Sequence, residues 1–318
     1  MNENNTFRDR AAILLVVLAA AGAACIPWNR APAAPPTAAA VDTVVDARIA
    51  FLTDFYKMYV LHAHSGEPPT PFYSTAAEAL IAENDALCRT LSRSDDICGY
   101  GADIDVFLST QETAPDLSFA RLQFKAALVD DSTVDVAFNV WPEYGADSAR
   151  QLRYKLVPEG AAWRVDDVLI GENGVYSQTS SMRHEILDEN QRVRADAADA
   201  AQVAGWIFIH LSQQDMLERI ARFMYFPVQI CGRTGRCRAV DGRGPQLASA
   251  LSIMHRAYYK KDGDDTIDLA PLFVRARLPP PVEGATVRVG AVQLSFRDKA
   301  WWISKIDLAA LGQPITVR

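Results

Sequence analysis

Four cysteines form the clearest chemical pattern in this chain, because they lie in two close pairs. Cys88 is followed by Cys98, and Cys231 is followed by Cys237. Zinc ligands are usually separated by two to four residues, whereas these spacings are longer and no histidine lies near either pair. Neither spacing is the Cys-x-x-Cys of redox-active thiols. We therefore predict two local disulfides, which persist in an oxidising compartment.

Histidines and carboxylates suggest weaker sites. His62 and His64 could bind a metal ion with a neighbouring carboxylate, but side chains two residues apart on a helix point in different directions. Aspartates at strand ends and turns usually cap backbone amides. The candidates for an acid/base carboxylate are two aspartate pairs, Asp103 with Asp105 and Asp166 with Asp167. We assign no catalytic, cofactor-binding or metal-ligating residue and expect no cofactor.

The segment Gly232–Arg238 combines two glycines with three arginines. It resembles a phosphate-binding loop in composition but lacks the Gly-Lys-Ser/Thr ending of such loops. Because cysteines lie at its two ends, a disulfide-closed turn explains the segment better. Its arginines would then form an exposed contact point for an acidic partner or a lipid head group.

The amino terminus has the layout of a signal peptide. Arg8 and Arg10 precede an uncharged apolar block over 11–24, and Cys25 follows directly. The small residues before Cys25 resemble the motif after which bacterial lipoproteins are cleaved and lipidated on cysteine, although Gly22 stands where an aliphatic residue is usual. Cleavage among the alanines, or retention of 11–28 as a membrane anchor, are the alternatives. Each option places the body outside the cytoplasm, in the periplasm, and we expect a membrane anchor.

Composition excludes several classes of protein. The chain has 318 residues, of which 49% are hydrophobic and 22% charged, as in ordinary globular proteins. Its 32 basic and 39 acidic residues give a net charge of −7. This acidic balance argues against a broad phosphate-binding surface, so we expect no nucleic-acid partner.

The pattern of apolar residues predicts an α+β order, in which helices are followed by strands. A signal peptide or anchor over 1–24 is followed by a Pro/Ala-rich tether over 25–41, and a first α+β domain is expected over 42–190. Its expected helices are 43–61 and 75–91, and its expected strands are 118–129, 133–141, 150–158 and 163–170. The Glu159-Gly160 pair marks a hairpin between the last two.

A polar, helix-prone bridge over 180–200 precedes a second, possibly duplicated α+β domain at 196–318. We expect helices over 203–226 and 244–259, then strands over 272–278, 285–296 and 300–308. The closing hairpins align without a gap, with 154–169 lying over 292–307 and Trp163 matching Trp301. This alignment suggests a degenerate internal duplication, in which each hairpin buries its tryptophan.

Four segments of the first half carry a resemblance: Phe51–Tyr59, the run Asp-Val-Phe-Leu-Ser-Thr-Gln-Glu at 105–112, Val134–Phe138 and the run Trp-Arg-Val-Asp-Asp-Val at 163–168. They are similar to bacterial envelope proteins grouped as domain of unknown function 3828. The similarity covers about 41–187, with Val106 standing where the family has proline. The resemblance implies an NTF2-like (cystatin-like) cone fold, with helices packed on a curved antiparallel sheet, often in exported lipoproteins. It implies no activity.

Two function classes remain. We expect an exported, non-enzymatic lipoprotein with two tandem NTF2-like domains, which binds an envelope protein partner or a small ligand. The alternative is a periplasmic enzyme with an acid/base site in a cone pocket. Tyr56, Tyr59, Trp163 and Trp301 are candidates to line such a pocket or fill the core. A pocket that holds a histidine close to a carboxylate would favour the enzyme.

Overall fold

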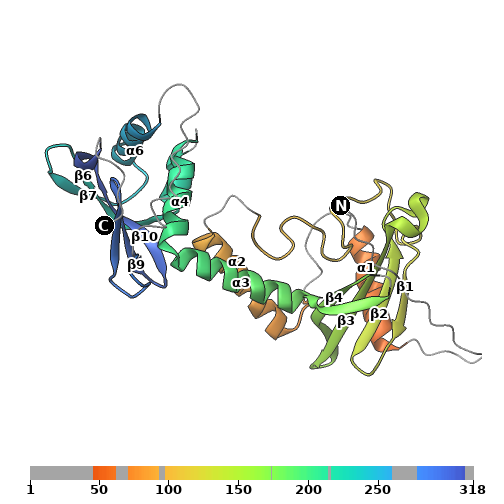
Figure 1. The fold of residues 1–318 in the computed structure, drawn as a ribbon. Coiled ribbons are helices and arrows are strands. Elements are labelled where there is room, and N and C mark those ends of the chain that lie inside the picture. The colour runs from red at the N-terminus through yellow and green to blue at the C-terminus, as the bar shows by residue number, and fades with distance from the viewer. Residues whose placement is uncertain are drawn as a thin grey trace, which may run out of the picture. The chain divides into compact units, whose positions relative to one another are not determined.

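The computed structural model describes residues 46–61, 71–92, 97–172, 174–213, 216–259 and 278–311. The signal segment, Cys25, His62, His64 and most of the expected strand at 272–278 lie outside these residues. Within the described residues, none of the helices has the length and apolar content needed to cross a bilayer. Both halves combine helices with a sheet, so the expected α+β class is confirmed (Figure 1).

The chain begins its described fold with two helices, α1 (Ala47–Leu61) and α2 (Thr75–Leu91). Helix α2 starts where the Ser74 side chain accepts a hydrogen bond from the Ala77 amide, a standard N-cap. Helix α1 lies across one face of the first sheet (Figure 1) and buries Leu52, Tyr56 and Tyr59. The two helices expected from apolar spacing are thus confirmed.

The first sheet is an antiparallel meander in the order β1-β2-β3-β4-β5. Alternate residues of β2, such as Val134 and Val136, point into the core. The expected strand 118–129 is reduced to β1, and β5 was not expected because its sequence is mostly polar. The strands are β1 (Lys125–Leu128), β2 (Thr133–Asn139), β3 (Ala149–Glu159), β4 (Ala162–Glu172) and β5 (Val175–Ser181), with a 3-10 turn η1 (Pro142–Ser148) between β2 and β3.

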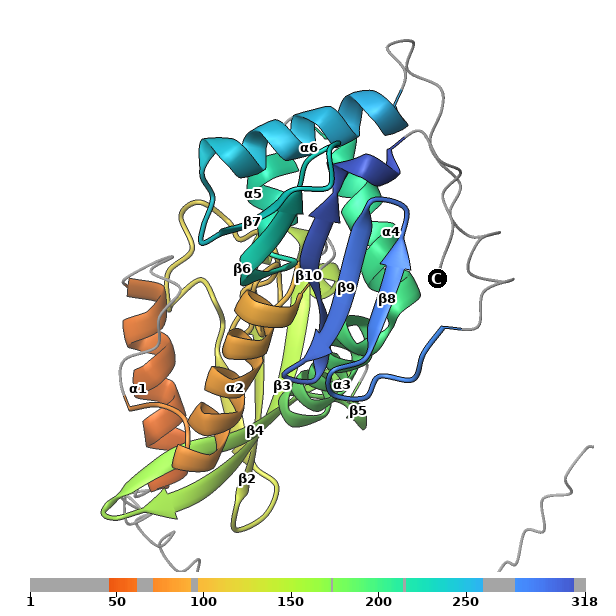
Figure 2. The ribbon, with the colours of Figure 1, turned by 90° about the vertical axis from the view of Figure 1, so that its left-hand side faces the viewer.

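The polar bridge is a regular helix, α3 (Met182–Ala198), which lies beside α2 (Figure 2). Its N-cap is Ser181, and it ends at Asp199, whose side chain accepts the amides of Ala201 and Gln202 and so starts the next helix. The expected domain boundary at 190–196 falls inside α3, and the division of the chain into two domains stays a prediction.

The second half does not contain the long helix that we expected over 203–226. That stretch divides into α4 (Ala200–Leu211), α5 (Met216–Ala221) and the first part of strand β6 (Met224–Cys231). Pro227 cannot donate a helical hydrogen bond, and the aromatic and branched residues around it favour a strand. The expected helix at 244–259 is confirmed as α6 (Pro245–Tyr258).

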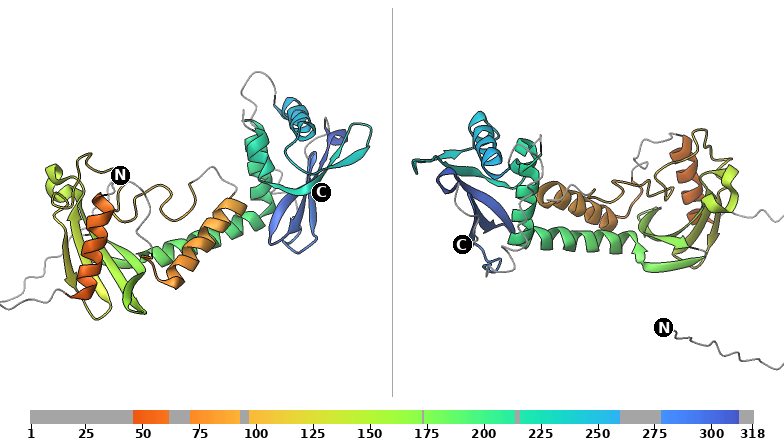
Figure 3. Two further views of the ribbon diagram at one scale, coloured as in Figure 1. Left: turned by 180° about the vertical axis from the view of Figure 1, so that it is seen from behind. Right: turned by 45° about the horizontal axis from the view of Figure 1, so that its top comes forward.

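The second sheet has the order β7-β6-β10-β9-β8, with helices α4 and α6 on one face (Figure 3). All its neighbouring strands are antiparallel except β6 and β10, which are parallel. Its remaining strands are β7 (Cys237–Val240), β8 (Thr286–Val289), β9 (Val292–Arg297) and β10 (Ala300–Asp307), followed by a 3-10 turn η2 (Leu308–Ala310). The single strand expected over 285–296 is therefore a hairpin of β8 and β9.

The two sheets share a three-stranded meander but not their whole topology. Strands β2-β3-β4 match β8-β9-β10, and the aligned hairpins keep the same register: Leu156 faces Val165 as Leu294 faces Ile303. Even the β-bulge recurs, at Asp166 in β4 and at the aligned Ser304 in β10. The fourth strand differs, because β5 runs antiparallel to β4 whereas β6 runs parallel to β10. The expectation of similar topology thus holds for the meander alone.

The matched tryptophans differ in burial. Trp301 is 0% exposed and its indole donates a hydrogen bond to the Ala198 carbonyl at 2.8 Å. Trp163 is only partly buried, at the edge of the first core, where the Arg48 guanidinium lies 5.5 Å from its ring centre. The expectation that both hairpins bury a tryptophan was therefore correct for one of them.

Candidate ligand-binding cavity

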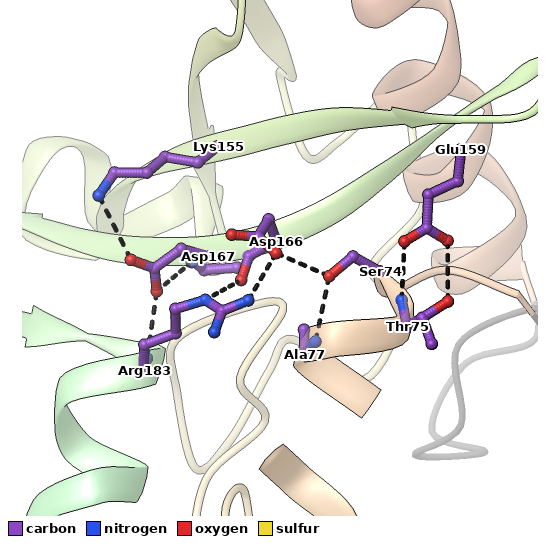
Figure 4. A network of polar contacts seen from close by, with 9 residues as sticks. Ser74, Thr75, Ala77, Lys155, Glu159, Asp166, Asp167 and Arg183 are labelled. Atoms are coloured by element: carbon purple, nitrogen blue, oxygen red, sulfur yellow. Dashed lines mark hydrogen bonds and ion pairs between the residues drawn. The ribbon is translucent and has the colours of Figure 1, made fainter. Parts of the chain in front are cut away.

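The aspartate pair Asp166 and Asp167 lies where β4 meets the first turns of α2 and α3 (Figure 4). Asp166 accepts hydrogen bonds from the Ser74 hydroxyl (2.7 Å) and the Arg183 guanidinium (2.5 Å). Asp167 accepts the Arg183 amide (3.1 Å), and Lys155 lies 3.4 Å away. Both carboxylates are occupied by donors, so they connect helices to the sheet and are poorly placed for acid/base chemistry.

The same junction is strengthened by Glu159 at the end of β3. Its carboxylate accepts the Thr75 amide at 2.9 Å and the Thr75 hydroxyl at 3.2 Å (Figure 4). A carboxylate beside the first turn of α2 also interacts favourably with the helix dipole. Together, these hydrogen bonds hold the first turns of α2 and α3 against the sheet.

Asp105, another acid/base candidate, also accepts hydrogen bonds with both of its carboxylate oxygens. One of its oxygens accepts the amides of Phe107 and Leu108, both at 3.0 Å, and the other accepts the Tyr59 hydroxyl at 2.8 Å. Burial raises the pKa of Tyr59, and the neighbouring Asp105 charge raises it further. The pair therefore holds a neutral phenol against a carboxylate and shapes the loop that follows α2.

The inner face of the first sheet is filled by aromatic and aliphatic side chains. The Tyr56 hydroxyl donates to the Phe107 carbonyl (2.8 Å) and lies 2.7 Å from the Tyr154 hydroxyl. Burial raises the pKa of both tyrosines well above the usual value. Tyr56, Tyr154 and Leu156 are at most 1% exposed, so they belong to the packed core of the first half.

A cavity of about 300 Å³ opens beside this core, between the loop at 99–109, strands β4 and β5, and helix α3. Apolar side chains from the loop, β4 and α3 form part of its wall, and four carboxylates and one arginine supply its charge. The apolar residues are Ile104, Val106, Val168, Ile170, Met182 and Ile186, and the charged ones are Asp103, Glu185, Asp188, Glu189 and Arg192. The wall thus combines apolar side chains with an excess of negative charge.

The carboxylates of this cavity differ in whether they have hydrogen-bond or ion-pair partners. Glu189 is 3.3 Å from Arg192 and also accepts the Gly99 amide at 3.1 Å. Asp103, Glu185 and Asp188 have no hydrogen-bond or ion-pair partner among the described residues. Partial burial raises the pKa of Glu185. Three carboxylates are therefore available to a ligand.

A buried polar cluster holds the cavity wall in place. Asn84 of α2, which is 0% exposed, donates to Glu189 (2.8 Å) and to Asn190 (2.9 Å) of α3 and accepts the Tyr100 amide (2.8 Å). The Cys88–Cys98 disulfide lies beside Glu189. Since both sulfurs are in the disulfide, this group cannot supply thiolate ligands to a metal ion.

A second, more open cavity of about 470 Å³ lies against the loop at 100–107. Tyr59, Tyr73 and Tyr100 contribute to its wall, and Asp103 and Asp105 contribute its charge. No histidine lines either cavity among the residues that the structure describes. Neither of these two cavities therefore has, in its described lining, the histidine close to a carboxylate that would favour an acid/base enzyme.

Both cysteine pairs form the expected disulfides, with Cα atoms 5.6 Å apart for Cys88–Cys98 and 3.9 Å apart for Cys231–Cys237. These bonds fit an oxidising, extracytoplasmic location. Compared with known protein families, with characterised proteins and with solved structures, the chain shows no match. The similarity to domain of unknown function 3828 stays a prediction that depends on the short motifs of the first half.

Sequence analysis identified Asp103 but missed Glu185 and Asp188. A signal was present, because Met182, Glu185, Ile186 and Glu189 follow the spacing of one helix face. Acidic residues interspersed with apolar ones along that face would have indicated a helix surface that is partly buried and partly exposed to solvent. Only the position of α3 against β4 and β5 shows that this face lines a cavity.

Proposed function

We propose that this chain is an exported, non-enzymatic binding protein, anchored to the membrane through Cys25, that takes a small ligand in the cavity beside α3. The observation that carries the proposal is the cavity, in which apolar side chains and unpaired carboxylates lie together without a histidine among the described lining residues. Such a mixed wall is typical of ligand sites. Two tandem NTF2-like domains remain our proposal for the fold, supported by the shared meander.

The ligand class follows from the charges. Asp103, Glu185 and Asp188 favour a cation, and the apolar wall favours an aliphatic or aromatic body attached to it. We therefore propose an organic amine with an apolar chain. An anionic ligand of the same shape would meet three unpaired carboxylates, which disfavours it by electrostatic repulsion.

Location is tested by fractionation of the native host. The wild-type chain is expected in the membrane fraction of the envelope, and Cys25→Ser is expected to release the chain or to change its partition. Peptide mapping of this material without reduction should recover Cys88 with Cys98 and Cys231 with Cys237. Cytosolic wild-type chain with four free thiols would overturn the location, whereas unchanged partition of the variant would overturn lipidation alone.

Ligand binding is tested by titrating the full chain with hexylamine, hexanol and hexanoate in a calorimeter. We expect hexylamine to bind at least about tenfold more tightly than hexanoate, because charge complementarity at a partly desolvated site separates them. Binding should weaken as the pH falls through the raised pKa of Glu185, since the protonated carboxyl no longer attracts the amine.

Matched variants separate the cavity from general surface charge. The double change Glu185→Gln with Asp188→Asn is expected to weaken hexylamine binding about tenfold or more. Glu83→Gln, on the exposed side of α2 and paired with Arg194, removes a carboxylate outside the cavity and should leave binding unchanged. Equal affinity for the amine and the acid, or an equal effect of both variants, would contradict the proposed ligand class.

A further inference from the structure

The hairpin of β6 and β7 is a rigid projection at the edge of the second sheet. β7 is the outermost strand of the order β7-β6-β10-β9-β8, and the hairpin extends away from the other strands (Figure 1). The Cys231–Cys237 disulfide closes its end, and the Gly232 amide donates to the Arg236 carbonyl at 2.9 Å. Gly235 takes a positive φ of 78°, which its lack of a Cβ allows. The disulfide and this hydrogen bond therefore restrict the backbone that carries the side chains of the tip.

This hairpin is positively charged, although the chain as a whole is acidic. Between Glu218 and Asp241 the sequence has five arginines and no carboxylate, although the whole chain carries −7. Arg233, Arg236 and Arg238 are all exposed on the tip and on β7. A cluster of three positive charges within six residues is thus presented to solvent.

These arginines have no carboxylate partner among the described residues, unlike the exposed Arg194 and Arg243. Arg194 pairs with Glu83, and Arg243 pairs with Glu218. No ion pair joins Arg233, Arg236 or Arg238 to another of the described residues. Their guanidinium groups are free to bind an external anion.

We propose that the disulfide-closed hairpin is a docking surface for an anionic phospholipid membrane, independent of the cavity. Guanidinium groups match phosphate oxygens in geometry and charge. Beside its arginines, the tip from Gly232 to Arg238 carries no aromatic or large aliphatic side chain of the kind that anchors many protein interfaces. Binding to the phosphate head groups of a membrane surface requires no such apolar anchor. The residue types therefore favour a lipid surface over an acidic protein.

The expected strength suits a protein that is already held near a bilayer. Each basic side chain at an anionic surface contributes roughly a fivefold preference, so three give on the order of a hundredfold. Alone this contact is weak, but an N-terminal anchor would raise the local concentration of the hairpin at the membrane. The contact would then orient the folded body relative to the lipid surface.

Arginine footprinting on the full chain tests the proposal. The chain is incubated with phosphatidylcholine vesicles that contain either no phosphatidylglycerol or one third of it, and is modified with phenylglyoxal. Mass spectrometry then gives the modification rate of each arginine. We expect the rates at Arg233, Arg236 and Arg238 to fall at least about fivefold with phosphatidylglycerol. Arg194 and Arg243, exposed and paired, are matched controls in the same molecule and should not change.

The outcomes discriminate between partners. Protection that disappears in about 0.5 M salt supports the membrane contact, because screening then acts within a few ångströms. Equal rates in both vesicles would overturn the proposal. Protection by an extract of envelope proteins, with none by phosphatidylglycerol, would also overturn it and indicate an acidic protein partner.

Discussion

Replacing Trp301 by alanine is expected to lower the free energy of unfolding by about 3–5 kcal/mol. The side chain is 0% exposed, its ring meets Phe296 edge-on at 5.3 Å, and its indole nitrogen satisfies the Ala198 carbonyl. The change would create a cavity in the second core and leave a carbonyl at the end of α3 without its partner. Urea denaturation followed by circular dichroism measures the loss.

The aligned Trp163 is the natural control for this experiment. Because it is partly exposed and packs at the edge of the first core, Trp163→Ala should cost less than half as much. The Arg48 guanidinium above its ring adds only a modest cation–π contribution at such a site. Equal losses for the two variants would show that the hairpins close their cores in the same way, contrary to this structure.

Replacing Asn84 by alanine is expected to lower the free energy of unfolding by about 2–4 kcal/mol and to weaken ligand binding at the same time. The side chain donates to Glu189 and Asn190 and accepts the Tyr100 amide, so one change leaves three groups of two other segments without their partner. Tyr100 and Glu189 line the cavity. Denaturation gives the stability, and hexylamine titration gives the binding.

The neighbouring Glu83 serves as the control for Asn84. Glu83→Ala removes an exposed ion pair with Arg194, and such pairs contribute at most about 1 kcal/mol. It should therefore leave both stability and binding nearly unchanged. An Asn84→Ala chain that is as stable as Glu83→Ala would mean that the polar cluster between α2 and α3 does not hold the loop at 99–109 in place.

The repeated β-bulge strengthens the case that the two hairpins share an origin. A gap-free alignment of hairpins that end in tryptophan can arise by chance, but the structure adds an identical register on both sides of the aligned bulge positions, Asp166 and Ser304. Bulges re-aim the side chains beyond them. Yet Asp166 binds Ser74 and Arg183, whereas Ser304 donates to the Gln293 carbonyl, so the same backbone feature has different side-chain partners.

The sequence by itself determined the features that depend on residues close together in the chain. The helix at 75–91 was predicted to the residue from its helical pattern, which is a local signal, and the Ser74 cap that the structure adds is also local. The hairpin of β3 and β4 followed from strand patterns around Gly160, and both disulfides followed from short spacings and an export signal. In each case the interacting groups are near neighbours, so their chemistry is visible without knowledge of the fold.

Only the tertiary structure decided features that depend on distant partners. The stretch at 203–226 is apolar enough for one long helix, but β6 gains a parallel partner in β10, about 75 residues further on, and that pairing outweighs local preference. The polar strand β5 forms because β4 offers it an edge. Asp166 and Asp167 had the residue types of an acid/base pair, and became structural because Ser74 and Arg183 lie beside them. The cavity likewise exists only because α3, β4 and the loop at 99–109 meet, and such long-range packing leaves little trace in local sequence.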